Sequence, residues 1–156
     1  MIRRAETRDI PDVLRLLHQV LDIHHRGRPD LFRAGGTKYG EGELAEIFRN
    51  PDTPVFVFTD EGDARVQGYC FCIRQQILGD AIRTDAATLY IDDLCVEEAC
   101  RGRHIGRQLY EHVLAYARAQ GYHNVTLNVW SCNPEALAFY RRMGMQPQKI
   151  GMEVVL

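Results

Sequence analysis

The chain has 156 residues, of which 46% are apolar, so it is long enough to bury the core of one domain but short for two. Its formal net charge of -2 offers no basic surface, which excludes DNA and RNA as expected partners. No apolar stretch approaches the roughly 18 residues of a membrane-spanning helix, and the N-terminus carries no export signal, so we expect one cytoplasmic domain over residues 1–156 without a membrane partner.

The N-terminal part of the chain is expected to form one short strand and two helices. The strand covers residues 2–5. The first helix is capped by Asp9, carries apolar residues at three- and four-residue steps, and should end before Gly27. The second helix covers residues 43–49, and the segment 22–42 before it is expected to be irregular.

The middle of the chain is rich in β-branched and aromatic residues, which indicates three strands. Two of them, residues 54–59 and 65–75, flank a hairpin-like turn at Glu61-Gly62-Asp63 and should pair antiparallel. The third covers residues 88–96 and follows a polar loop over residues 79–86.

The C-terminal part predicts a helix over 105–119, a strand over 125–129, a helix over 134–143 and a closing strand over 149–155. Because a strand, helix and strand in succession need a crossover, strands 88–96 and 125–129 should be parallel neighbours, while the others should pair antiparallel. The expected fold is a single-domain α/β (α+β) architecture with a mixed, mostly antiparallel sheet of six to seven strands and helices on both faces.

A turn with two glycines and three arginines precedes the helix over 105–119. A helix N-terminus offers unpaired backbone N–H groups and a positive dipole end, and glycine lets the backbone approach a ligand closely, so a diphosphate would fit here. A solvated helix cap would show the same residues, and neither the GxGxxG pattern nor a P-loop is present. The candidate contacts are Arg101, Gly102, Arg103, His104, Ile105, Gly106 and Arg107.

A second pattern begins at Asn133 and runs to Met145. Ala136, Phe139 and Tyr140 recur there at helical spacing, so a phenol and an apolar stripe share one face, as a thioester arm requires. Two structural roles compete with this interpretation, because Asn133 also suits a helix N-cap and Tyr140 a core aromatic.

Together the two patterns resemble the GNAT acyltransferase superfamily. Residues 101–106 are similar to its acetyl-CoA loop, Arg/Gln-x-x-Gly-x-Gly/Ala, and residues 133–145 to its signature Asn-x-x-Ala-x-x-Phe-Tyr-x-x-x-Gly-Phe. The segment order fits over the whole chain. One departure is His104, which stands at the first glycine of the loop and would either crowd a diphosphate or donate to it.

The resemblance implies acetyl-CoA as the cofactor. The main chain of Leu94, Cys95 and Val96 would then leave its neighbouring strand and bond the pantetheine like an added strand. Amides of residues 103–107 would hold the diphosphate, and Asn133 would bond the cofactor arm.

The resemblance also implies catalytic roles. Tyr140 would lie near the thioester sulfur and serve as the acid that protonates the leaving thiolate. The acceptor amine must lose a proton, and the family's pattern selects Asp92 as base or water-holder and Tyr90 on the same face. Strand alternation would send Asp93 to the opposite face, as a structural acceptor.

The irregular segment after the first helix is expected to line the acceptor side, as in proteins of this family. A mixture of histidine, arginine and an aromatic ring could recognise a polar amine, although a solvated loop would look the same. The candidate residues are His24, His25, Arg28 and Phe32.

We therefore expect an acetyl-CoA-dependent N-acetyltransferase that acts directly on a primary amine of a small molecule or of a protein or peptide, and a homodimer is compatible with the sequence. The alternative is an acyl-CoA-binding regulatory module without turnover. A plain dimerising domain would leave the pattern after Asn133 unexplained. The five cysteines include no CxxC pair, which favours reduced thiols and indicates no metal site.

Overall fold

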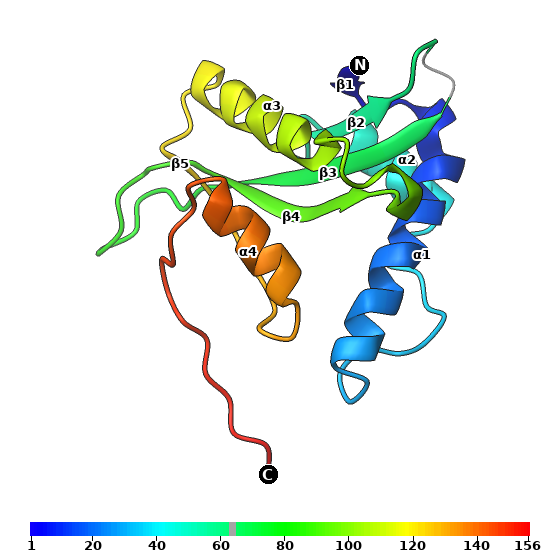
Figure 1. The fold of residues 1–156 in the computed structure, drawn as a ribbon. Coiled ribbons are helices and arrows are strands. Elements are labelled where there is room, and N and C mark those ends of the chain that lie inside the picture. The colour runs from blue at the N-terminus through cyan, green and yellow to red at the C-terminus, as the bar shows by residue number, and fades with distance from the viewer. Residues whose placement is uncertain (63–64) are drawn as a thin grey trace.

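The computed structural model describes residues 1–62 and 65–156 and contains one mixed sheet with the strand order β1-β2-β3-β4-β5 (Figure 1). The strands are β1 (Ile2–Arg4), β2 (Val55–Thr59), β3 (Val66–Gln75), β4 (Thr88–Val96) and β5 (Asn124–Leu127). The first four pair antiparallel and β5 pairs parallel with β4, so the predicted mixed sheet is confirmed.

Two helical layers cover the two faces of this sheet. The helices are α1 (Ile10–Gly27), α2 (Glu41–Arg49), α3 (Ile105–Ala119) and α4 (Pro134–Arg142), with short 3-10 turns η1 (Thr7–Asp9) and η2 (Glu98–Cys100). Leu16 of α1 and Leu44 of α2 are fully buried in one core cluster, and Leu109 of α3 is fully buried in the other. Tyr140 of α4 packs against the cluster of α3, which confirms helices on both faces.

Within the described residues the sheet has five strands, not six to seven, and the expected closing strand over residues 149–155 is wrong. In the described part of the chain no backbone hydrogen bond involves residues 146–156, which extend away from the body of the molecule (Figure 1). Ile150 and Val154 are 79% and 81% exposed. The β-branched residues suggested a strand, but these side chains have no face to pack on and the backbone has no partner.

Two smaller expectations also change. The helix expected to stop before Gly27 includes it, so α1 takes up the first residues of the segment that was expected to be irregular. The second helix starts at Glu41 instead of residue 43. The expected turn at Glu61-Gly62-Asp63 cannot be followed throughout, because Asp63 lies outside the described residues. No helix in the part of the chain described by the structure is long and apolar enough to cross a membrane.

Candidate functional site

The centre of the candidate site is the point where β4 and β5 separate. Their pairing runs from Thr88 opposite Asn124 to Ile91 opposite Leu127, where β5 ends while β4 continues to Val96. From Asp92 onward, β3 is therefore the only strand of the described chain that pairs with β4. An extended ligand could add to this open edge as a strand would.

The end of β4 is fixed from the opposite side by α1. Gln19 Nε2 donates to the Val96 carbonyl at 3.0 Å and lies 3.4 Å from the Cys95 sulfur. Burial raises the pKa of the Cys95 thiol to about 12, so this cysteine stays protonated at neutral pH. Cys95 is consequently a packing residue and not a nucleophile.

The loop that follows β4 has the free amides of an anion site. Within the described residues, the backbone N–H groups of residues 102–107 donate no hydrogen bond, and the first amide of α3 that does is Gln108, to the His104 carbonyl at 3.0 Å. Residues 101–104 are exposed. The loop therefore presents several donors and the positive end of α3 to the solvent above the open end of β4.

His104 adopts a left-handed conformation with φ of 60°, the one positive φ of a non-glycine residue in the described chain. Such a conformation costs an L-residue with a Cβ roughly 1–2 kcal/mol, which glycine avoids. The loop geometry thus favours glycine at the position where His104 departs from the family pattern.

The second pattern is folded against this loop. Phe139 of α4 meets the start of α3, since a Cβ on Gly106 would lie 3.6 Å from the Phe139 ring and 3.5 Å from Val96. Asn133 caps α4, and its Oδ1 accepts from the Ala136 amide at 3.2 Å. The cap uses the side-chain oxygen, so the Asn133 amide nitrogen is available to a ligand, and both expected roles are compatible.

Tyr140 lies on the same side of the sheet as α3. Its ring centroid is 5.0 Å from Phe139 and 6.3 Å from Tyr110. Burial raises its pKa well above the ordinary value, and the charge of Asp93 adds to the increase. The phenol is therefore held protonated, the state in which it can donate.

A β-bulge decides where the two aspartates point. Phe71 of β3 lies opposite Asp93, and the next residue, Cys72, lies opposite Ile91, so Asp92 is an extra residue in β4. Ile91 packs in the cluster under α3, whereas Cys95 packs in the cluster under α1 and α2. A regular strand would place both residues on one face.

The expectation that Asp92 and Asp93 face opposite sides is wrong, because it assumed regular alternation. Asp92 Oδ2 lies 2.6 Å from Lys38 Nζ and accepts from the Tyr39 hydroxyl at 3.2 Å. Asp93 accepts from the Tyr69 hydroxyl at 2.8 Å. All three partners belong to the layer of α1, α2 and the core beneath them. Burial raises the pKa of Asp93 to about 6, while Tyr69 opposes the increase.

The expected acceptor residues are only partly brought together. The rings of His24 and Phe32 are tilted by 31° with their centroids 5.0 Å apart, and Phe32 meets Trp130 edge-on at 5.3 Å. His25 Nδ1 is 2.7 Å from the Phe32 carbonyl, a contact that shapes the loop. The chain after α1 therefore reaches the loop between β5 and α4 and encloses one side of the site.

Two other expected acceptor residues have partners elsewhere. The Arg28 guanidinium binds Asp30 at 2.8 Å and also pairs with Glu153 of the C-terminal segment. The Tyr90 hydroxyl accepts from Asn128 at 3.3 Å. Arg28 thus points to the C-terminal segment, and Tyr90 lies where β4 and β5 still pair.

Sequence reasoning missed Lys38, Tyr39, Tyr69 and Trp130. Two of them carried a usable signal: Lys38 is one of two lysines in the chain, and Trp130 is its single tryptophan. Tyr69 carried none, because a tyrosine inside an apolar strand looks like any core residue.

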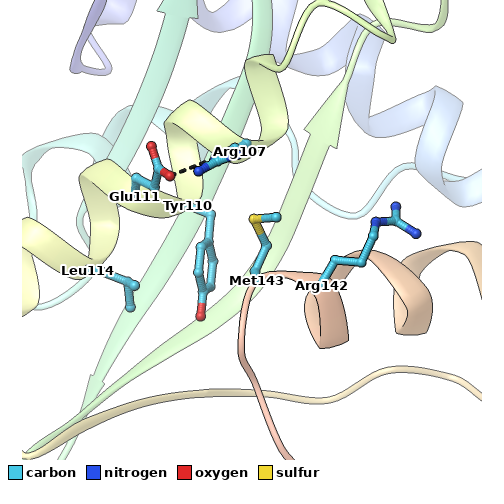
Figure 2. A pocket seen from close by; sticks show the side chains of 6 residues that line it. All are labelled: Arg107, Tyr110, Glu111, Leu114, Arg142 and Met143. Atoms are coloured by element: carbon cyan, nitrogen blue, oxygen red, sulfur yellow. Dashed lines mark hydrogen bonds and ion pairs between the residues drawn. The ribbon is translucent and has the colours of Figure 1, made fainter.

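A cleft of about 220 Å³ lies between α3 and the end of α4. Figure 2 shows the side chains that line it. Arg107 Nε lies 2.7 Å from Glu111 Oε1, one turn further along α3. The guanidinium of Arg107 therefore lines this cleft, whereas its backbone amide is part of the loop. The lining residues are Arg107, Tyr110, Glu111, Leu114, Arg142 and Met143.

Comparison with known proteins agrees with this geometry. The family model described as Acetyltransferase (GNAT) family matches residues 17–145. The chain is 32% identical over 89 residues to the 5-NmdU N-acetyltransferase of Pseudomonas phage PaMx11, covering 57% of this chain and 56% of that protein. It is 30% identical over 63 residues to glucosamine 6-phosphate N-acetyltransferase 1 of Oryza sativa subsp. japonica, covering 40% of this chain and 36% of that protein. The chain thus spans about half, or less, of the length of these two relatives.

Among solved structures, a mutant of the BH1408 protein from Bacillus halodurans superposes with a TM-score of 0.94 at 33% identity, covering 100% of this chain and 99% of that chain. The arrangement of elements therefore extends over the whole of both chains.

Proposed function

The chain belongs to the GNAT acetyltransferase family, and on this premise we propose that it transfers an acetyl group from acetyl-CoA directly to a primary amine. The observation that carries the proposal is the convergence at the open end of β4. There the free amides of residues 102–107 meet the side of α4 that carries Asn133, Phe139 and Tyr140.

The described residues suit acetyl-CoA. The open edge at Leu94, Cys95 and Val96 would hold the pantetheine arm with Asn133, and the loop amides would hold the diphosphate. Ala136 and Phe139 would add apolar contact along the arm. Bound acetyl-CoA supplies an acetyl group activated as a thioester.

The acceptor must be deprotonated before it can attack. An amine with a pKa near 10.4 is neutral in only about one molecule in 2500 at pH 7. The sequence pointed to Asp92 as the base or water-holder. We now assign Asp92, which already binds one ammonium, to hold the acceptor, and Asp93, with a pKa of about 6, to take up its proton. Tyr140 would give a proton to the leaving thiolate.

A small-molecule acceptor is favoured over a peptide. One relative is named a glucosamine 6-phosphate N-acetyltransferase, and the contact between Phe32 and Trp130 leaves less room for a peptide on the acceptor side. A second cleft, of about 290 Å³, opens beside Tyr39 and contains Glu43 and Glu46, which suits an acceptor with further positive charge. His24 and Phe32 would contact its apolar part.

Cellular setting and assembly belong to the same proposal. We propose a cytoplasmic protein that does not bind nucleic acid, in keeping with its net charge of -2. The apolar side chains exposed in the C-terminal segment, among them Met152 and Val155, support a homodimer. Sedimentation measurements would test this assembly.

The direct test follows free thiol release from acetyl-CoA in the presence of a panel of small amines and of lysine peptides. We expect release with at least one small polyamine or amino sugar. Binding of acetyl-CoA without release by any amine would favour the alternative, a regulatory module. No binding would contradict the proposal altogether.

A further inference from the structure

Lys38 places a primary ammonium group on the acceptor side of the site. It comes from the segment between α1 and α2, and its Nζ lies 2.6 Å from Asp92 Oδ2 and 5.4 Å from the centre of the Tyr39 ring. Its side chain is 38% exposed, so it is neither buried in the core nor free in solvent. Burial opposes the charged form, but the hydrogen bond and charge of Asp92 outweigh it and raise the pKa of Lys38.

The surroundings of this ammonium are those expected of a bound acceptor. Asp92 directly precedes Asp93 and the open edge that begins at Leu94. The charge of Asp93 contributes to the raised pKa of both Lys38 and Tyr140, so this carboxylate lies within electrostatic reach of both groups. An amine held by Asp92 therefore shares its carboxylates with the machinery proposed above.

We propose that Lys38 is itself an acetylation site, modified in cis by the enzyme that carries it. The inference rests on the proposed function. Acetylation would replace the ammonium by a neutral amide, release Asp92 from its ion pair and leave that carboxylate for the ammonium of an external acceptor. The unmodified Lys38 would compete with such an acceptor for Asp92.

The transfer is balanced with the groups at hand. Lys38 gives one proton to a carboxylate, and its neutral nitrogen forms a bond to the acetyl carbon while the carbon–sulfur bond breaks. The departing sulfur takes a proton from the Tyr140 hydroxyl. The nitrogen then loses its second proton, and this proton returns Tyr140 to its protonated form. The products are N-acetyl-lysine, free coenzyme A and one proton released to solvent.

The composition of the chain makes the test unusually clean. Lys38 and Lys149 are its only lysines, and Lys149 lies in the exposed C-terminal segment. Cleavage after arginine places Lys38 in the peptide 34–49 and Lys149 in the peptide 143–156. Lys149 is therefore an internal control for acetylation by acetyl-CoA without catalysis.

The experiment incubates the full chain with isotope-labelled acetyl-CoA alone and follows both peptides by mass spectrometry. We expect Lys38 to be labelled at least about tenfold faster than Lys149, because an amine held beside the thioester reacts as an intramolecular partner. The first-order rate should not change when the protein is diluted. Lys149→Arg should leave labelling at Lys38 unchanged, and Asp93→Asn should slow it.

Three outcomes would overturn the inference. Equal labelling of the two lysines would indicate uncatalysed chemistry, and a rate that falls on dilution would indicate transfer between molecules. An unlabelled Lys38 in an enzyme that releases thiol with external amines would refute the modification and leave the proposed function intact. Failure to bind acetyl-CoA or to release thiol with any amine would instead refute both.

Discussion

At the scale of single residues, His104 combines a side chain and a backbone conformation that rarely occur together. Its φ of 60° is one that glycine adopts without strain. We predict that His104→Gly is more stable than His104→Ala by about 1 kcal/mol, because alanine keeps the Cβ that makes the conformation unfavourable. Denaturant unfolding of the two variants measures the difference.

The same pair of variants separates backbone strain from ligand contact. If the imidazole crowds the diphosphate, both variants should bind acetyl-CoA more tightly than the wild-type protein in calorimetry. Weaker binding by both would show that the ring donates to the phosphate, which is the other role open to it.

Tyr140 tests the acid role without disturbing the core. Its hydroxyl makes no hydrogen bond within the described residues, so Tyr140→Phe should leave the free energy of unfolding nearly unchanged. We expect the turnover rate to fall by about tenfold to a thousandfold, the usual range for loss of a general acid. Tyr110→Phe, which changes the neighbouring ring on α3, is the matched control and should keep most of the activity.

Asp93 should leave a signature in the pH dependence of stability. Its pKa is raised from 3.8 to about 6 in the folded protein, so folding takes up a proton between pH 3.8 and about pH 6. Above that range the carboxylate is charged in both states, and its burial destabilises the folded protein. Asp93→Asn removes that charge. Relative to the wild-type protein, the variant should therefore gain stability as the pH rises from about 4 to 7, by an amount on the order of 2 kcal/mol.

The control for this prediction is Asp92→Asn, which loses the partner of Lys38. It should weaken apparent acceptor affinity more than the maximal rate and should not reproduce the stability gain, whereas Asp93→Asn should lower the rate. The opposite assignment of the two effects would show that Asp92 is the base and Asp93 its structural support.

At the scale of elements, α1 and the loop before α4 meet through a contact between Gly27 and Cys132. A Cβ on Gly27 would lie 2.8 Å from the Cys132 sulfur, which is closer than real contacts allow. Gly27→Ala should therefore displace the loop that carries Asn133 and weaken acetyl-CoA binding, although alanine is the better helix former. Adding Cys132→Gly should restore binding, and a double-mutant cycle without coupling would contradict the contact.

Sequence alone predicted the helices and strands around the proposed cofactor site well, because their signals are local. Each of these signals lies within the segment that it predicts. They are the glycines before α3 and the spacing of Asn133, Phe139 and Tyr140. The contacts on the proposed acceptor side were not predicted. Lys38 reaches Asp92 across 54 positions, and Phe32 meets Trp130 only because the chain after α1 folds back.

The two errors in the sheet have different physical causes. The bulge places one extra residue in β4, and nothing in the sequence from Tyr90 to Leu94 marks its position. The faces of the sheet to which Asp92 and Asp93 point could therefore not be deduced. The closing strand failed for a tertiary reason. β propensity describes how well a residue fits a half-buried surface, and no such surface lies beside the C-terminal segment in the described structure.

At the scale of the whole molecule, the two core clusters on either face of the sheet carry the stability, and the C-terminal segment lies outside both. Met143 and Met145 still pack against the cluster of α3, whereas the residues after them are exposed. Among the described residues, an ion pair of Arg28 with Glu153 at the surface ties the segment back, and such surface pairs contribute little.

We therefore predict that deleting residues 147–156 changes the free energy of unfolding by no more than about 0.5 kcal/mol, as surface changes usually do. Deleting residues 143–156 is the matched control, and it should destabilise the protein clearly because it also removes the two packed methionines. Thermal and denaturant unfolding at low protein concentration measure both. A large loss from the shorter deletion would mean that the segment covers an apolar face of the folded protein in solution, as the strand expected over residues 149–155 would have done.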